Sequence, residues 1–302
     1  MASIILLFLC LGLGVLFRIT SLFPKETPNV LNQFVIFISL PSIALFYLPQ
    51  VEISSQLLFP VGVAWIGFAV AALLFLTLGK IFNWSRSLIG CLILTGGLGN
   101  TSFVGIPVIE ALYGKEGLKT LVLVDLPGTF MVLSTFGILV AASYSRGETS
   151  FKEILWRMFK FPPFIAFLIG ISFALSGIHF PETINSVFEK LGATVTPLAL
   201  VSVGYQLKIE KKSKHWKFLT LALIYQLMAW PAIIFTLYKY VFHQSGLSFQ
   251  VCVMEAAMAP MITAAIIASS YGLKPKLSSM MIGIGIPASF ITMAFWYWIL
   301  NF

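Results

Sequence analysis

Charged residues are scarce in this sequence, which excludes an ordinary soluble domain. Asp, Glu, Lys and Arg make up 10 % of the 302 residues, whereas soluble domains carry about 25 %. Asp125 is the one aspartate in the chain. The cysteines, Cys10, Cys91 and Cys252, lie inside apolar runs, so they give no disulfide framework and are expected to be small buried side chains.

The residues that catalysis or nucleic-acid binding requires are missing too. All three histidines lie between apolar runs, and neither a His-Glu-x-x-His helix nor a Gly-x-Ser-x-Gly elbow occurs. One aspartate cannot supply the pair that an intramembrane aspartyl protease needs. The net charge of +8 is divided among short loops, which is a membrane topology signal. We expect no enzyme, no catalytic residue, no metal site, no nucleic-acid partner and no cofactor beyond a coupling H⁺ or Na⁺.

Long apolar runs are what the sequence has in abundance. Hydrophobic residues make up 59 % of the chain, and the mean hydropathy is +0.96. Runs near the length that crosses a bilayer recur throughout, so we predict an all-α polytopic membrane protein with ten transmembrane helices. The predicted spans are 2–20, 29–48, 57–79, 88–112, 119–143, 161–178, 185–207, 217–241, 247–271 and 277–300.

The basic residues predict how these spans are oriented. When the loops are assigned alternately to the two sides, all Lys and Arg fall on one side except Lys115, Lys119, Lys190 and Lys239. The positive-inside rule places the basic side in the cytoplasm. Both termini are then extracytoplasmic, in a multi-pass protein of the plasma membrane that contacts lipid.

An internal repeat divides the chain into halves. Phe23-Pro24 recurs at Phe180-Pro181, Asn29 and Pro41 recur at Asn185 and Pro197, Tyr113-Gly114 recurs at Tyr271-Gly272, and "PGTF" (127–130) has a counterpart in "PASF" (287–290). A five-span unit places the second copy upside down, an architecture that is frequent in secondary transporters. We predict inverted repeats at 1–143 and 161–302, joined by a cytoplasmic linker at 144–160.

Two spans contain residues that break helices. The run "GGLGNTSFVGIP" (96–107) interrupts the fourth span, and the repeat places "AAMAPMIT" (256–263) at the same depth of the ninth. Broken helices present free N–H groups to a ligand and attract anions, although a kink satisfied by neighbouring helices is the structural alternative. The predicted substrate-binding residues are Gly99, Asn100, Thr101, Ser102, Pro260, Met261 and Thr263. The predicted hinge residues are Gly96, Gly97, Gly105, Pro107, Pro41 and Pro197.

Two acidic residues lie at membrane depth, where ionisable groups are functional candidates. Asp125 lies in the fifth span and Glu255 in the ninth, and no basic residue lies at comparable depth. We predict that they bind the coupling H⁺ or Na⁺, the alternative being a hydrogen bond to backbone freed at the breaks. Glu110 lies near a span end and is expected to be interfacial.

The motifs resemble the auxin efflux carrier family, the bacterial permeases related to plant auxin exporters. "GNTSFVGIPVIEALYG" (99–114) is similar to its fourth-span motif, "LVLVDLPGTF" (121–130) to its fifth and "AMAPMITAAIIASSYGLKP" (257–275) to its ninth. The resemblance implies a dimerising scaffold of spans 1, 2, 6 and 7, and a transport domain of spans 3–5 and 8–10 with crossing helices 4 and 9. It also implies an elevator-type mechanism and substrates such as malate, malonate or auxin. Leu98 and Gly99 replace the Asn and Pro of plant members.

These features together favour a secondary transporter of small organic anions that forms a homodimer. A receptor or sensor with the fold of a carrier is the alternative, because it would need the same binding site. A channel is less well supported, since no ring of selectivity residues is evident.

Overall fold

The computed structural model describes residues 2–50, 57–145, 159, 162–206 and 215–302, in which every regular element is a helix. The first half contains α1 (Ala2–Thr20), α2 (Thr27–Phe34), α3 (Leu40–Tyr47), α4 (Leu58–Ile81), α5 (Arg86–Gly96), α6 (Ile106–Leu123) and α7 (Ile138–Tyr144). The second contains α9 (Pro162–Ser176), α10 (Glu182–Gly192), α11 (Val195–Gln206), α12 (Trp216–Ile224), α13 (Trp230–Thr236), α14 (Gly246–Ala256), α15 (Ile262–Ser270) and α16 (Pro275–Asn301). Most of the predicted linker, 144–160, lies outside the described residues.

Six stretches of the described chain are long and apolar enough to cross a membrane. They are Thr27–Gln50, Leu58–Ile81, Thr101–Tyr144, Glu182–Gln206, Trp216–Val241 and Pro275–Asn301. Shorter apolar helices cover Ile5–Thr20, Arg86–Gly96 and Pro162–Ser176. The prediction of an all-helical, multi-pass membrane protein is confirmed, whereas the number of ten spans stays a prediction.

Several of these long helices widen into a π-helical turn just before a proline. The segments Val35–Ser39, Thr101–Gly105 and Tyr225–Ala229 are π-helical, and each is followed at its second residue by Pro41, Pro107 or Pro231. Proline has no N–H and its ring clashes with the carbonyl four residues earlier, so the wider turn relieves the clash. Two predicted hinge residues, Pro41 and Pro107, thus follow local departures from the α-helix.

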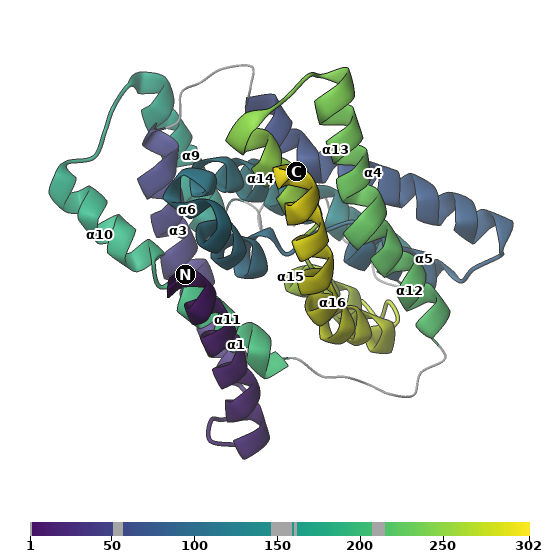
Figure 1. The fold of residues 1–302 in the computed structure, drawn as a ribbon. Coiled ribbons are helices and arrows are strands. Elements are labelled where there is room, and N and C mark those ends of the chain that lie inside the picture. The colour runs from purple at the N-terminus through teal and green to yellow at the C-terminus, as the bar shows by residue number, and fades with distance from the viewer. Residues whose placement is uncertain (1, 51–56, 146–158, 160–161, 207–214) are drawn as a thin grey trace.

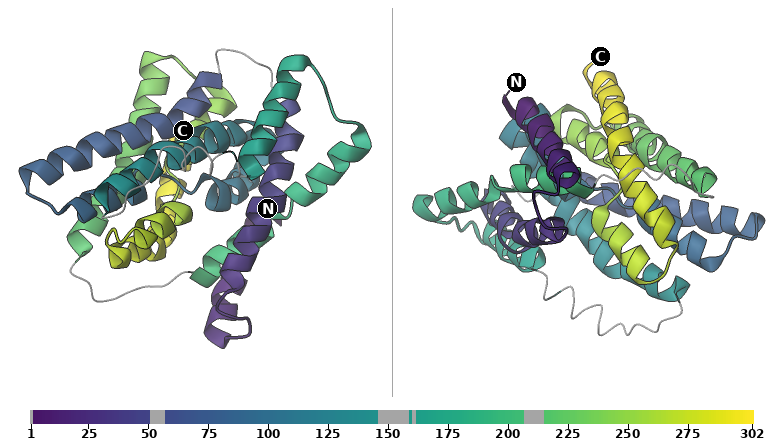
Figure 2. Two further views of the ribbon diagram at one scale, coloured as in Figure 1. Left: turned by 180° about the vertical axis from the view of Figure 1, so that it is seen from behind. Right: turned by 90° about the horizontal axis from the view of Figure 1, so that it is seen from below.

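The helices fall into two groups by their contacts. α1 packs along α11, and α3 packs on α9 and α10, at the left of Figure 1. α4, α5, α7 and α12–α16 form the other group at the right, where α14 packs on α6 and α15 on α5. Two other views separate the groups in the same way (Figure 2). α6 lies between them, because it also contacts α1, α3 and α11.

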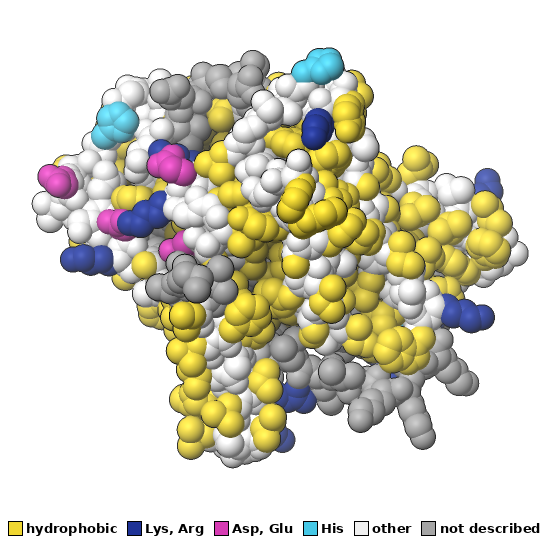
Figure 3. Space-filling model, in the orientation of Figure 1, with side chains coloured by type: hydrophobic (Ala, Val, Ile, Leu, Met, Phe, Trp, Pro, Cys, Tyr) yellow, Lys and Arg dark blue, Asp and Glu magenta, His cyan; other side chains and the backbone are white. Residues whose placement is uncertain are grey.

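The surface of this bundle is mostly apolar. In Figure 3 the hydrophobic side chains cover much of the visible face, and charged side chains lie toward its periphery. Large side chains such as Ile19, Leu73 and Ile291 are more than two-thirds exposed. Extended apolar surface of this kind marks a membrane interaction.

The crossing of α1 and α11 depends on glycine. A Cβ atom on Gly14 would meet the backbone carbonyl of Val201, and one on Gly204 would meet the carbonyl of Leu11. Glycine pairs of this kind let membrane helices approach until their backbones touch. The two backbones could not keep this distance with any other residue at either position.

We expect Gly14→Leu to destabilise the protein, because the new side chain would push α1 away from α11. Overpacking costs about 1–3 kcal/mol, which should lower the midpoint of thermal unfolding in detergent by several degrees. Gly12→Leu on the same helix is the matched control, since a Cβ there meets nothing within 4 Å. Equal midpoints for the two variants would contradict the assigned crossing.

Candidate functional site

The first break separates α5 from the π-helical segment Thr101–Gly105. Asn100 has φ −86° and ψ 63°, outside the helical region. Its Oδ1 atom accepts a hydrogen bond from the N–H of Phe103 at 3.2 Å, which is the arrangement of a helix N-cap. Asn100 therefore starts a new half-helix that continues into α6.

The second break separates α14 from α15. α14 ends at Ala256, and Met261 precedes α15 in an extended conformation, with φ −70° and ψ 123°. Pro260 lies inside the break and has no N–H to donate. The second half of the chain thus stops and restarts a helix as the first half does.

The two breaks meet as a short antiparallel pair. Gly99 and Pro260 face each other, and the N–H of Asn100 donates to the carbonyl of Ala259 at 2.7 Å. A second bond of 3.0 Å joins the N–H of Met261 to the carbonyl of the residue before Gly99. Peptide groups freed from a helix are costly inside a membrane unless they are paired. We call this pairing of residues 98–100 with residues 259–261 the crossover.

A glutamine from a neighbouring helix supports the crossover. Gln226 lies in the π-helical segment Tyr225–Ala229 and is completely buried. Its Nε2 atom donates to the carbonyl of Leu98 at 3.0 Å. Gln226 was not predicted as a site residue, although an amide within the apolar run 217–241 is a signal that could have identified it.

Asp125 is held by two of the predicted substrate-binding residues. The Thr101 hydroxyl donates to Asp125 Oδ1 at 2.5 Å, and the Ser102 hydroxyl donates to the same oxygen at 2.6 Å. All three side chains are buried. These two hydroxyl hydrogens are committed to the carboxyl group, so Thr101 and Ser102 can contact a ligand only through their remaining lone pairs. The partners of Asp125 are hydroxyls, not the freed backbone groups considered as the alternative.

Glu255 lies against the first turn of the other half-helix. Its carboxyl group is fully buried, and neither oxygen has a hydrogen-bond partner within the described part of the chain. A Cβ atom on Gly105 would lie 2.7 Å from Oε1 and 2.9 Å from Oε2. Glycine at position 105 therefore makes room for this carboxyl group, and the same π-helical segment carries Thr101 and Ser102, which hold Asp125.

The crossover region thus holds polar atoms that the protein leaves unsatisfied. Among the described residues, Asn100 Nδ2, Gln226 Oε1 and both Glu255 carboxyl oxygens are buried without a partner. Burying an unpaired polar group costs free energy, and burying an unpaired ionised carboxylate costs much more. Such atoms are where a ligand, a proton or a cation would be bound.

Several other predicted residues lie outside the crossover. Gly97 follows α5 directly and donates its N–H to Ile93, and Gly96 is the last residue of that helix. Thr263 lies half-buried in the first turn of α15. Pro197 belongs to α11, which contacts Thr101–Gly105, and Pro41 belongs to α3, which contacts α6.

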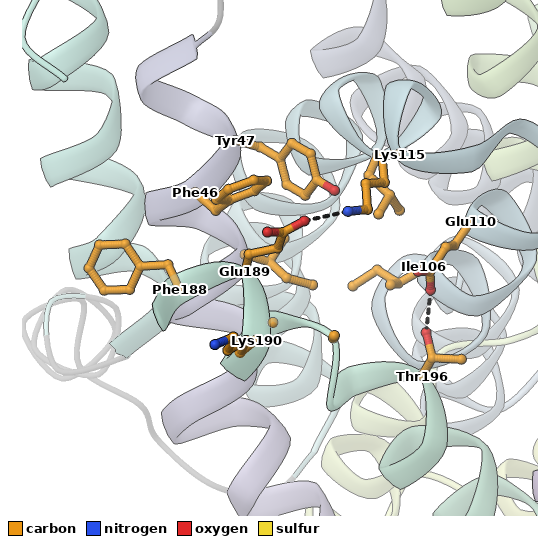
Figure 4. A pocket seen from close by; sticks show the side chains of 13 residues that line it. Phe46, Tyr47, Ile106, Glu110, Lys115, Phe188, Glu189, Lys190 and Thr196 are labelled. Carbon is orange, nitrogen blue, oxygen red and sulfur yellow. Dashed lines mark hydrogen bonds and ion pairs between the residues drawn. The ribbon is translucent and has the colours of Figure 1, made fainter. Parts of the chain in front are cut away.

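A cavity of about 230 Å³ lies between α6 and the group of helices that contains α3, α10 and α11. Lys115, just after the kink at Gly114, forms an ion pair with Glu189 of α10 on one side of it. The Thr196 hydroxyl donates to Glu110 at 2.7 Å on another side (Figure 4). Neither the Lys115–Glu189 pair nor the Thr196–Glu110 pair was predicted from the sequence. The expectation that Glu110 is interfacial stays a prediction.

A groove of about 550 Å³ lies on another part of the molecule. Its walls include Gln206 of α11 with Ser269 and Ser279 of α15 and α16. It reaches Ile262, the first residue of α15, as the 230 Å³ cavity reaches Ile106, the first residue of α6. Each half-helix that leaves the crossover therefore borders a cavity or groove along part of its length.

Comparison with known proteins identifies the family. The model of the family described as "Membrane transport protein" matches residues 1–297. The chain belongs to this family. That assignment confirms the resemblance to the auxin efflux carriers and makes transport across a membrane, not catalysis, the activity of the family.

Two archaeal relatives are similar along nearly their whole length. An uncharacterized transporter of Methanocaldococcus jannaschii is 31 % identical over 310 residues, which cover 99 % of this chain and 98 % of the relative. An uncharacterized transporter of Methanothermobacter thermautotrophicus is 28 % identical over 288 residues, which cover 94 % of this chain and 93 % of the relative. Both names describe transporters, and neither gives a substrate.

Proposed function

We propose that this protein is a secondary transporter of small organic anions that binds its substrate at the crossover. The observation that carries the proposal is the antiparallel pair of Gly99 and Pro260. Two half-helices start there, and helix N-termini favour negative charge because their N–H groups are free and their dipoles align. The unpartnered Nδ2 of Asn100 adds a buried donor beside them. The two helix N-termini and the amide donor together favour binding of a carboxylate group.

The proposed architecture has ten spans in two inverted repeats, residues 1–143 and 161–302. The order of elements supports it, because each half runs through a helix, an interrupted helix, a long helix, a broken pair and a last helix. Spans 1, 2, 6 and 7 are the scaffold, which forms a homodimer in the plasma membrane with both termini outside. Spans 3–5 and 8–10 carry the crossover through the membrane in an elevator-type movement.

Asp125 and Glu255 are the proposed site of the coupling ion. Two nearby buried carboxyl groups cannot both be ionised without a compensating positive charge. Lys and Arg side chains do not hydrogen-bond to either of them in the described residues. A proton or Na⁺ that enters from one side and leaves on the other supplies that charge and couples its gradient to the movement.

Counter-flow in proteoliposomes tests the proposed function. We expect that labelled malate, malonate or indole-3-acetate accumulates transiently in vesicles preloaded with the same unlabelled anion, with saturable kinetics. A carrier shows this stimulation because its binding site carries an unlabelled anion out of the vesicle and returns with a labelled anion. A receptor would bind the anion without flux, and a channel would conduct it without counter-flow stimulation, so either result would contradict the proposal.

A further inference from the structure

The 230 Å³ cavity lies where α6 faces α3, α10 and α11, and both charged and apolar side chains line it. Lys115 and Glu110 come from the α6 side, and Glu189 and Thr196 come from α10 and α11. Apolar walls are supplied by residues such as Phe46 and Phe188. Figure 3 shows acidic side chains gathered with lysines at the left of the visible face, where α10 lies in Figure 1.

The cation in this cavity is accessible. The Lys115 side chain is 64 % exposed and that of Glu189 is 41 % exposed. In Figure 4 the Tyr47 hydroxyl points toward this ion pair, whereas the Lys190 amine points away from it. An exposed ion pair contributes little stability because water screens it, so another carboxylate can replace Glu189 at small cost.

The cavity also borders the half-helix that starts at the crossover. Ile106 lines it and directly follows Gly105, the residue that faces Glu255. The charge distribution predicts that Lys115 and Lys190 lie on the extracytoplasmic side. The volume is below the roughly 300–1,000 Å³ of pockets for drug-sized ligands, which restricts the occupant to a small molecule.

We propose that this cavity is an outer binding site for a small organic carboxylate, in which the incoming carboxylate replaces Glu189 as the partner of Lys115. The apolar walls then contact the body of the anion, and the Tyr47 hydroxyl lies beside its carboxylate. The inference rests on the proposed function for its ligand class. It adds a second site, between α6 and the helices α3, α10 and α11, through which the anion reaches the crossover.

The proposal predicts that substitutions at the two partners of the Lys115–Glu189 ion pair change the affinity for a carboxylate in opposite directions. Thermal unfolding of the purified protein is measured against malate, malonate and indole-3-acetate, with sodium chloride at matched ionic strength. Lys115→Gln should weaken binding about tenfold because the cation is lost. Glu189→Gln should tighten it about threefold because the competing carboxylate is lost. Lys115→Arg keeps the charge and should retain most of the binding.

A matched control is available on the same helix. Lys119 pairs with Glu116 and is not among the residues that line the cavity, so Lys119→Gln removes one lysine and one ion pair elsewhere. We expect unchanged binding for this variant. The proposal is wrong if Lys115→Gln and Glu189→Gln change affinity in the same direction, because the pair would then only hold the helices together.

A comparison of these variants with Asn100→Ala distinguishes binding at the outer site from binding at the crossover. If that variant still binds a carboxylate in a manner that depends on Lys115, the outer site exists apart from the crossover. If the anions are transported but Lys115→Gln and Glu189→Gln bind as the unmodified protein does, only the outer site is wrong. If none of the three anions binds or is transported, the proposed substrate class fails and the outer site fails with it.

Discussion

Replacement of Asn100 by alanine is expected to reduce counter-flow uptake of the transported anion by about ten- to a hundredfold. A hydrogen bond to a charged group contributes about 1.5–3 kcal/mol, and each 1.4 kcal/mol corresponds to a factor of ten. Asn100 Nδ2 is buried and has no partner in the described protein. It is therefore a donor that only a ligand or a water molecule can satisfy.

The difficulty with this variant is that Asn100 also caps a helix. Its Oδ1 atom accepts from Phe103, and loss of such a cap costs about 1 kcal/mol of stability. Asn100→Ser separates the two roles, because a serine hydroxyl can cap the helix but has no amide nitrogen. We expect Asn100→Ser to unfold near the temperature of the unmodified protein and still lose most of the uptake.

A second amide serves as the control for Asn100. Asn185 of α10 donates to the carbonyl of Phe180 at 3.4 Å, away from the crossover. Asn185→Ala should therefore leave uptake within about twofold of the unmodified protein, once the amount of folded protein is matched. Uptake by Asn100→Ser at the unmodified rate would remove the amide from the binding site.

The breaks could be predicted from the sequence because glycine, asparagine and proline inside an apolar run destabilise a continuous helix. Their register could not be predicted. The repeat aligns Asn100 with Met258, whereas the structure pairs Gly99 with Pro260. A repeat offset compares positions along two copies, but the pairing depends on how two chains running in opposite directions meet in space.

Polar residues of the candidate site could be identified from the sequence, but their contacts could not. Thr101, Ser102 and Asp125 were each identified, but as members of two separate sites. The structure joins them, because both hydroxyls donate to one carboxyl oxygen. Which way a side chain points from its helix depends on neighbouring helices, and no spacing in the sequence contains that information.

Side-chain contacts between distant segments outside the crossover were not predicted. Lys115 and Glu189 are 74 residues apart, and each was only a loop or span-end charge in the sequence. The hinge of the predicted seventh span was placed at Pro197, whereas α10 ends at Gly192 and α11 begins at Val195. A Cβ on Gly192 would lie 2.9 Å from Ile43, so this glycine is required by close packing that only the folded chain reveals.

Neutralising the buried carboxyl groups is expected to uncouple transport from ion gradients. If Asp125 and Glu255 bind a coupling proton or Na⁺ as proposed, uptake by the unmodified protein should respond to pH or to Na⁺. Asn and Gln are neutral and have nearly the same shape as Asp and Glu. The substitutions Asp125→Asn and Glu255→Gln therefore remove the need for a compensating positive charge. Uptake by the double variant should be driven by the anion gradient alone and be independent of pH and Na⁺.

The two single variants and the double variant distinguish one shared ion from two. If one ion is shared by Asp125 and Glu255, either substitution alone should abolish the response to the gradient. If each carboxyl group binds its own ion, the response should persist in both single variants and disappear only in the double variant. Glu116→Gln is the control, because it removes a carboxylate that is exposed and paired with Lys119. A double variant that keeps the full response would show that coupling lies elsewhere, and Glu255 would then be a neutral residue for which Gly105 merely leaves space.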